Sequence, residues 1–351
     1  MYTPKQASNA ASSVELATLW HRVFGDDLTY VYRFYHHFQN DIDILIQCTG
    51  EDGNDGEIVS AAHFIPVSYR YFRKDYPGSY LYAAMTSPEH RGNNLMGRLL
   101  ELRLAQAYTN GELFMCTLPA EPSLYDLYAR FGFEPVFYLH RCVLTKQQLQ
   151  SNQLTLSFSS KASPAYSYAS TYARRELTVV KDKKFIEYTT IENEARNGMF
   201  KSVYSGYFYA REIPDGGVHV KELYLHGDNF PHIAHMLMSI YPHATQFVFD
   251  FCPGTCPAQF PYTIIRAGSA RIVNVFDALS AFARKNHENS MRFSLEDPLI
   301  EQNTADYFMK DGIAKMSQRK FELTPMSVSE FTRMIATDGG DGIPYMNMML
   351  D

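Results

Sequence analysis

The sequence predicts an α+β protein with more than one domain. Its 351 residues exceed the roughly 100–200 that one domain usually holds, so we expect two or three domains, each with its own core. In the first part of the chain, helix and strand patterns follow in the order helix, three strands, helix, strand, helix, strand. This order indicates a mixed sheet with helices packed on it.

The first element is an amphipathic helix over residues 13–24. Leu16, Leu19, Trp20 and Val23 recur at helical spacing, and Ser13 can cap the start of the helix. Apolar runs separated by turn residues then predict strands. A helix is expected to begin near Asn93 or Asn94, and a shorter one to end near Phe131. The expected strands cover residues 42–48, 57–72, 79–86, 113–118 and 133–144.

The remaining chain divides into two further regions. Residues 147–170 are rich in Gln, Ser and Ala and have little apolar periodicity, which is typical of a domain boundary. Beyond them, a helix over 185–200 and three strands are expected before residue 267. The last region combines strands with helices, one of which begins with Ser327 and Glu330 as a capping box. We therefore expect domains at 1–146, 165–267 and 268–351.

Composition limits the classes of partner. A net charge of −6 gives no general attraction to nucleic acids or acidic membranes and mildly favours a cationic substrate. No stretch reads as a secretion signal or a membrane span, so we expect a cytoplasmic protein without a membrane partner. Five scattered cysteines are expected to be reduced, and the His232/His235 and Cys252/Cys256 pairs lack the further ligands of a metal site.

The stretch SPEHRGNNLMGRLLELRLAQA, residues 87–107, predicts a turn that opens onto a helix. Pro88 ends the preceding strand, and Leu95, Leu99 and Leu102 supply the buried face of the helix. Backbone amides at the helix start, together with the helix dipole, favour a diphosphate, and Arg91 adds positive charge. An ordinary capped surface helix is the alternative interpretation.

A second motif, LYARFGF at residues 127–133, follows after one strand and a short helix. With this context the chain resembles the GNAT acyl-CoA N-acyltransferases. The resemblance implies that the turn from Arg91 to Met96 binds the coenzyme A pyrophosphate and that Tyr128 lies beside the thioester. Asn94 and Met96 stand where that family has small residues.

Three later segments narrow the resemblance to the Eis-like (enhanced intracellular survival) group. They are GYFYARE with VKELYLH, RIVNVFDAL, and the hairpin and helix near the end of the chain. This implies an N-terminal GNAT fold, a degenerate second GNAT-like domain and a C-terminal sterol-carrier-like domain. It also implies acetylation of amines, including aminoglycoside antibiotics, and assembly into oligomers.

The resemblance assigns roles to individual residues. Tyr128 becomes the general acid, because a phenol remains protonated at neutral pH and can deliver a proton to the leaving thiolate. The carboxylate of Asp351 at the chain end becomes the second catalytic group, and Asp26, Asp27 and Glu121 are candidates for binding the amine. Acetyl-CoA is the expected co-substrate, with no metal. Its expected contacts are Ala84, Met85, Thr86, Arg91, Gly92, Asn93, Asn94, Leu95 and Met96, the first three through their backbone.

Two other functions remain open from the sequence. The chain could be a non-catalytic binding protein that holds an apolar ligand or a partner through the sterol-carrier-like domain. It could also acetylate a protein lysine instead of a small amine.

Overall fold

The computed structural model divides into two compact units. It describes residues 2–7, 13–38, 41–49, 56–151, 159–160, 162–172, 175–203, 206–225, 230–317, 322–338 and 343–350. The first unit comprises Met1–Val136 and Gly268–Gly342, and the second comprises Phe137–Ala267 and Ile343–Asp351. The mixed α+β class is confirmed, and the three domain ranges expected from the sequence stay a prediction.

The first unit contains a mixed sheet whose first four strands are antiparallel neighbours in chain order. The fifth strand runs parallel to the fourth, and the end of a much later strand pairs with the fifth at Ser269–Ile272. The strands are β1 (Tyr2–Gln6), β2 (Asp43–Thr49), β3 (Ile58–Tyr71), β4 (Lys74–Thr86), β5 (Phe114–Thr117) and the part of β13 (Thr263–Ile272) that begins at Gly268.

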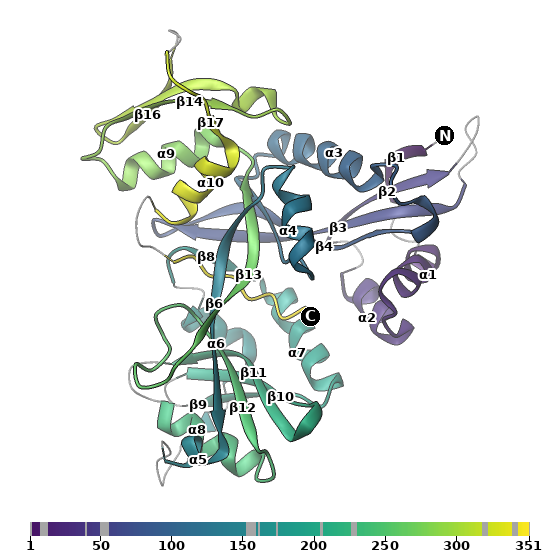
Figure 1. Ribbon diagram of the computed structural model, residues 1–351, viewed down its shortest axis with the longest axis vertical. Helices are drawn as coiled ribbons and strands as arrows, with labels where there is room; N and C mark the ends of the chain where they lie inside the picture. Colours follow the sequence, from purple (N-terminus) through teal and green to yellow (C-terminus); the bar gives the residue numbers. More distant parts are fainter. Residues whose placement is uncertain are drawn as a thin grey trace. The chain divides into compact units, whose positions relative to one another are not determined.

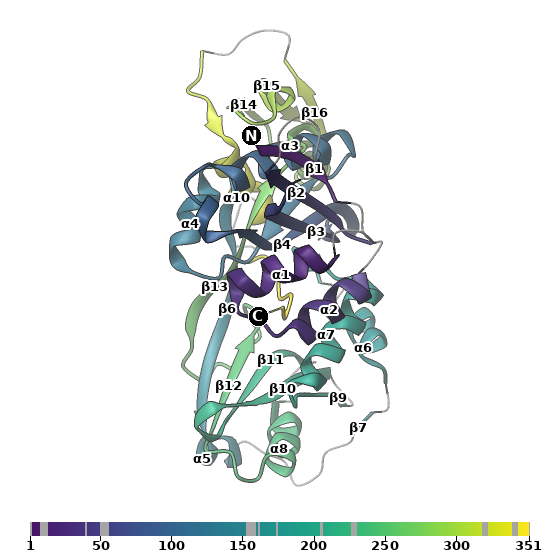
Figure 2. The ribbon, with the colours of Figure 1, turned by 90° about the vertical axis from the view of Figure 1, so that its right-hand side faces the viewer.

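Helices cover both faces of this sheet (Figures 1 and 2). The helices α1 (Ser13–Phe24) and α2 (Leu28–Phe38) lie on one face, where Trp20 packs against aromatic rings of α2 and β4. The helix α3 (Leu95–Thr109) lies on the other face and shares a core with α4 (Pro122–Ala129). The amphipathic helix expected at 13–24 is confirmed, whereas α2 was not expected.

The C-terminal part of the first unit is a small sheet with helices. Its strands follow the order β16-β15-β14-β17, and the predicted Ser327–Glu330 capping box is confirmed at the start of the last helix. The likeness of this region to a sterol carrier stays a prediction. The elements are α9 (Val275–Lys285), β14 (Met291–Glu296), η4 (Glu301–Asn303), β15 (Ala305–Lys310), β16 (Ile313–Met316), β17 (Met326–Ser327) and α10 (Val328–Ala336).

The second unit is built on a sheet with the order β6-β12-β11-β10-β9-β7, in which only β11 and β12 are parallel neighbours among the pairs with a described register. Its strands are β6 (Glu134–Thr145), β7 (Ser159–Ser160), β8 (Thr178–Val180), β9 (Met199–Val203), β10 (Gly206–Ile213), β11 (Gly217–Leu225) and β12 (Gln246–Phe251). Its helices are α5 (Lys146–Gln150), α6 (Pro164–Ser170), α7 (Lys183–Ala195), η3 (Pro214–Gly216) and α8 (Phe230–Ile240). The helix expected at 185–200 is therefore too long, because its last residues form β9.

The end of the chain is held in the second unit by hydrogen bonds. The backbone of Tyr345 pairs with residues 177–179, and its ring is buried. Lys181 Nζ donates to Glu222 Oε2 at 2.7 Å and to the Asn347 carbonyl at 3.0 Å, while Asn347 Nδ2 donates to the Lys221 carbonyl at 2.6 Å. One of these contacts therefore joins the tail to a buried ion pair.

Replacing Lys181 with Met is expected to destabilise the second unit. The Lys181 side chain is 3% exposed and that of Glu222 is 1% exposed, so the change strands a buried carboxylate, at a cost of roughly 3–5 kcal/mol. Lys183→Met is the matched control, because Lys183 is 78% exposed and its pair with Glu187 contributes little. Urea unfolding of both variants measures the difference, and equal stabilities would contradict the prediction.

Candidate active site

The central feature of the first unit is the point at which β4 leaves β5. The two strands pair from Gly78–Phe114 to Leu81–Thr117, where β5 ends, while β4 continues to Thr86. Its other edge remains paired with β3 as far as Ser60. Within the described ranges, no strand pairs with the β5 side of β4 beyond Leu81. That edge can therefore accept an extended ligand as an added strand.

A β-bulge lies within this free stretch of β4. Ala83 and Ala84 together face the single residue Ala62 of β3, and Ala83 has a φ of 43°. Such a bulge bends the strand and redirects its backbone groups. The predicted backbone contacts Ala84, Met85 and Thr86 thus directly follow the bulge, although the Met85 carbonyl already accepts a bond from the Ser60 hydroxyl at 2.9 Å.

His63 on β3 holds the bulge from one side of the sheet. Its Nδ1 lies 3.2 Å from the Ala83 carbonyl oxygen, and because a carbonyl only accepts, Nδ1 carries the proton. Its Nε2 then accepts from the Tyr35 hydroxyl at 2.8 Å. The C=O and N–H of one peptide point in opposite directions, so this contact turns the Ala84 N–H away from His63.

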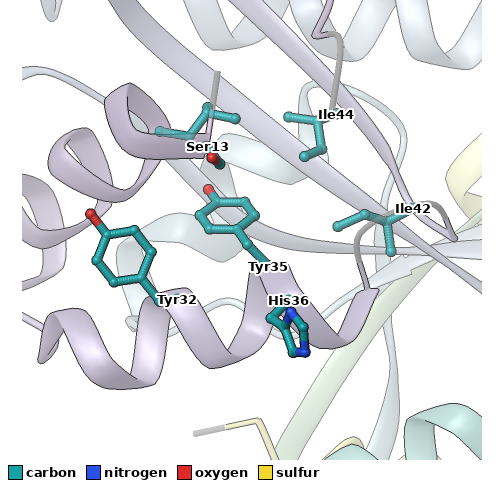
Figure 3. Close-up of a pocket in the computed structure, with 7 residues that line it drawn as sticks. Ser13, Tyr32, Tyr35, His36, Ile42 and Ile44 are labelled. Carbon is teal, nitrogen blue, oxygen red and sulfur yellow. The ribbon is translucent and has the colours of Figure 1, made fainter. Parts of the chain in front are cut away.

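The surroundings of His63 keep it neutral. Burial lowers its pKa to about 4, because the ring is fully enclosed among aromatic side chains. Tyr35 also borders a cavity of about 270 Å³, and Figure 3 shows its ring between the start of α1 and the strand that carries Ile44. The cavity is lined by Ser13, Leu16, Tyr32, Tyr35, His36, Ile42 and Ile44.

The turn after β4 has the geometry expected of an anion site. Gly92 has a φ of 82°, and a Cβ built there would meet no atom within 4 Å. Asn94 is left-handed at φ 54° and ψ 30°, and its side chain does not cap the helix. It instead occupies the space that a Cβ on Gly97 would fill. The first amides of α3 consequently have no intrahelical acceptor and no side-chain cap from Asn94.

Neighbouring side chains fix the turn to the end of β4. Arg91 Nε donates to the Thr86 carbonyl at 3.3 Å, and Asn93 Nδ2 donates to the His90 carbonyl at 3.0 Å. Leu95 is buried, and Met96 packs against the core under α3. The Met96 side chain therefore contributes to the core at the helix start.

Tyr128 on α4 reaches the point where the strands diverge. The residue is 6% exposed, and its phenol lies close enough to the Thr117 side chain for the two to interact. Thr117 Oγ1 in turn donates to the Leu81 carbonyl at 3.1 Å, across the last β4–β5 pair. Burial raises the pKa of Tyr128 to about 12, so the phenol holds its proton at neutral pH.

The candidate amine-binding residues lie in separate parts of the first unit. Asp26 accepts from the Trp20 indole at 2.8 Å, and Trp20 contacts the Tyr82 ring of β4. Asp27 is exposed, and its pKa is lowered first by the Thr29 side chain and then by the Thr29 amide, which donates to it at 2.7 Å. Glu121 precedes α4 and is exposed. Asp351 lies outside the described residues.

His63 and Thr117 were not singled out from the sequence. A histidine within the apolar run IVSAAHFIP was the available signal for His63, because a buried polar side chain requires a hydrogen-bond partner. Thr117 gave no signal beyond its place at the end of a strand. Among the described residues, no group of three or more His, Cys, Asp and Glu side chains is arranged to hold a metal ion.

The neutral His63 is expected to make stability depend on pH. An unfolded histidine binds a proton near pH 6.5, whereas folded His63 binds one only near pH 4. The free energy of unfolding should therefore fall as the pH drops between these values, by at most about 3 kcal/mol. His63→Asn, which retains a donor near the Nδ1 position, should flatten this fall in urea unfolding at pH 7 to 4.

The matched control for this pH series is His287→Asn, since the His287 side chain is 69% exposed. Its unfolding should follow the wild-type pH dependence. The assignment is contradicted if His63→Asn also follows the wild-type curve.

Comparisons with known proteins agree with this geometry. Residues 7–136 match the family model described as "Acetyltransferase (GNAT) domain". A probable N-acyltransferase from Enterococcus faecalis V583 has 15% identity and a TM-score of 0.77, over 95% of this chain and 89% of that one. Eis1 from Mycobacterium abscessus has 14% identity and a TM-score of 0.73, over 96% and 89%. No curated protein matches the sequence.

A GCN5-related N-acetyltransferase from Kribbella flavida has 14% identity and a TM-score of 0.75, over 96% of this chain and 89% of that one. At these identities the structures establish a shared fold. None of the described helices is long and apolar enough to cross a membrane. The resemblance expected from the sequence is confirmed: residues 7–136 match a GNAT acetyltransferase domain, and the chain shares the fold of Eis1 and other GNAT N-acetyltransferases.

Proposed function

We propose that the protein transfers an acetyl group from acetyl-CoA to a primary amine by direct attack. The observation that carries this proposal is the position of the Tyr128 phenol, which lies beside the Thr117 side chain where β4 leaves β5. A thioester beside the free edge of β4 would have its sulfur within reach of this phenol.

The coenzyme fits the residues around that edge. Its pyrophosphate would accept hydrogen bonds from the amides between Gly92 and Met96, with Arg91 adding charge. The open space at the Gly92 Cβ position leaves room for a phosphate. The pantetheine amides would pair with the backbone of residues 84–86 as an added strand.

The reaction needs two hydrogen-bond donors from the protein. As the amine attacks, negative charge develops on the carbonyl oxygen, and the Ala84 N–H, turned away from His63, is a donor for it. The amine gives up its proton to the proposed carboxylate of Asp351, directly or through water, and when the C–S bond breaks, Tyr128 donates a hydrogen bond to the leaving thiolate, which solvent then protonates. Complete proton transfer from a phenol of pKa about 12 to a thiolate of pKa about 8.5 would cost roughly 5 kcal/mol, so hydrogen-bond donation is the favoured role.

The acceptor is proposed to be a small primary amine, either aminoglycoside-like or another small amine. The net charge of −6 favours a cation, and Asp26, Asp27 and Glu121 are the proposed carboxylates that bind it. A catalytic carboxylate at Asp351, a homo-oligomer and a sterol-carrier-like C-terminal region belong to the same proposal on the resemblance alone.

A panel of amines tests the function. The protein is incubated with acetyl-CoA and one amine at a time, and free thiol is measured. Amine-dependent thiol release, with an acetylated amine found by mass spectrometry, is expected for at least one polyamine or aminoglycoside. Coenzyme binding without transfer to any amine, including lysine peptides, would contradict the proposal.

Replacing Gly92 with Val is expected to weaken coenzyme binding by roughly tenfold or more. The branched side chain would enter the phosphate space and would strain a backbone held at φ 82°. Calorimetric titration with coenzyme A measures the affinity. Gly254→Val is the matched control, because Gly254 has a φ of 78° and equally open space in the second unit. Equal coenzyme A affinities of the two variants would contradict the placement of the pyrophosphate at this turn.

Replacing Tyr128 with Phe is expected to lower the turnover number by roughly 10²–10³-fold, the usual effect of removing one hydrogen-bond donor to a developing negative charge. Coenzyme affinity should remain close to that of the wild type, because the ring and its packing against Phe133 are retained. Steady-state kinetics with a productive amine provide the measurement. A folded variant with near-normal turnover would contradict the assigned role.

A further inference from the structure

A buried arginine from the C-terminal part of the first unit contacts the turn that follows Tyr128. Arg271 lies on β13, and its side chain is 1% exposed. Its Nη1 donates to the Phe131 carbonyl, and its Nη2 donates to both carboxylate oxygens of Asp297, at 2.6 and 2.7 Å. The Asp297 side chain is fully buried.

The turn and the guanidinium fit closely. Gly132 has a φ of 79°, and a Cβ at that position would overlap Arg271 Nη1 and Val328 Cγ1. The amides of Phe131 and Phe133 both donate to the Tyr128 carbonyl, at 2.9 and 3.2 Å. The turn Phe131–Phe133 therefore links the two residues: its Phe131 carbonyl contacts Arg271, and its amides hold the backbone carbonyl of Tyr128.

Asp297 anchors the guanidinium from the opposite side. It accepts bonds from the amides of Leu299 and Ile300 at 3.1 and 3.2 Å, and from Asn303 Nδ2 at 2.9 Å. Asn303 Oδ1 accepts from the Val275 amide at 3.1 Å. Arg271 thus donates two hydrogen bonds to Asp297, and three further hydrogen bonds from the C-terminal segment hold that carboxylate in place.

We propose that Arg271 is a positioning residue for catalysis, which sets the reach of Tyr128 through the Phe131–Phe133 turn. This inference rests on the proposed role of Tyr128. A buried ion pair seldom adds net stability over an apolar replacement, so stability alone does not account for a buried arginine here. The planar guanidinium instead fixes an orientation, because it donates to the Asp297 carboxylate on one side and to the Phe131 carbonyl on the other.

The functional consequence follows from the geometry. Tyr128 is the last but one residue of α4, and the turn that ends this helix decides how far the phenol extends toward Thr117. A displacement of about 1 Å can cost roughly 100-fold in rate. The segment Gly268–Gly342 therefore takes part in transfer without touching the substrates.

Gly132→Ala tests the contact without removing a buried charge. The methyl group pushes the guanidinium away from the turn and should lower the turnover number roughly 10- to 100-fold, with little change in coenzyme affinity. Gly111→Ala is the control, because Gly111 has a similar φ of 73° but no atom within 4 Å of the added Cβ. It bears the same backbone strain and should retain its turnover. Equal turnover of the two alanine variants overturns the proposal.

A double-mutant cycle separates positioning from general structure. If Arg271 acts through Tyr128, Gly132→Ala should have little further effect on turnover in a Tyr128→Phe background. If Gly132→Ala lowered the turnover number of Tyr128→Phe as much as it lowers that of the wild type, the turn would act on something other than Tyr128, and the proposal would be overturned. Near-normal turnover of Tyr128→Phe alone would instead reject the proposed role of the tyrosine, so the two failures are distinguishable.

Arg271→Lys provides a second variant. Lysine keeps a positive charge beside Asp297 but cannot bond the carboxylate and the Phe131 carbonyl in the fixed fork of arginine. We expect a folded protein with normal coenzyme affinity and a turnover lowered to the level of Gly132→Ala. Normal turnover in this variant would overturn the positioning role, and so would a loss of coenzyme affinity that equals the loss of turnover.

Discussion

The divergence of β4 from β5 after the Leu81–Thr117 pair is the constraint on which the rest of the site depends. A sheet normally satisfies each backbone group with a neighbouring strand. Here β5 ends at Thr117 and β4 continues to Thr86, so no described strand pairs with the backbone on one edge of β4 beyond Leu81. The side chain of Thr117 closes the last pair by donating to the Leu81 carbonyl, and it also contacts Tyr128.

Two buried side chains act on the backbone on either side of this divergence. His63 holds the Ala83 carbonyl at the bulge, and Arg271 holds the Phe131 carbonyl after α4. One is neutral, because burial lowers its pKa to about 4, and the other is charged and paired with Asp297. Both direct a peptide group, and the proposed chemistry is then done by a backbone N–H and a phenol whose positions they determine.

Much of this arrangement could be predicted from local patterns. The turn after β4 was predicted because Pro88 ends a strand and a leucine face begins a helix, both within a few residues. The capping box at Ser327 was predicted for the same reason. In contrast, α2 was missed because its aromatic and histidine-rich sequence has no clear helical propensity. The start of β4 was placed too late, since Pro77 resembles a strand breaker although it lies on the ladder opposite Ser68.

The contacts that orient the site could not be predicted, because they join distant parts of the chain. Arg271 and Phe131 are separated by 140 residues, and nothing in either segment specifies the other. The buried polar side chains were visible in the sequence as a histidine and an arginine among apolar residues. Their partners became evident only once the sheet had brought β3, β4, β5 and β13 together.

Hydrogen exchange with and without acetyl-CoA tests the central claim most directly, because it reports on backbone amides at the edge of β4. The account predicts that bound coenzyme slows exchange in peptides covering residues 82–86 and 92–97, and leaves the exposed turn at Gly111 unchanged. If saturating coenzyme protected neither stretch, the divergence of β4 from β5 would not be the coenzyme site, and the account would be wrong.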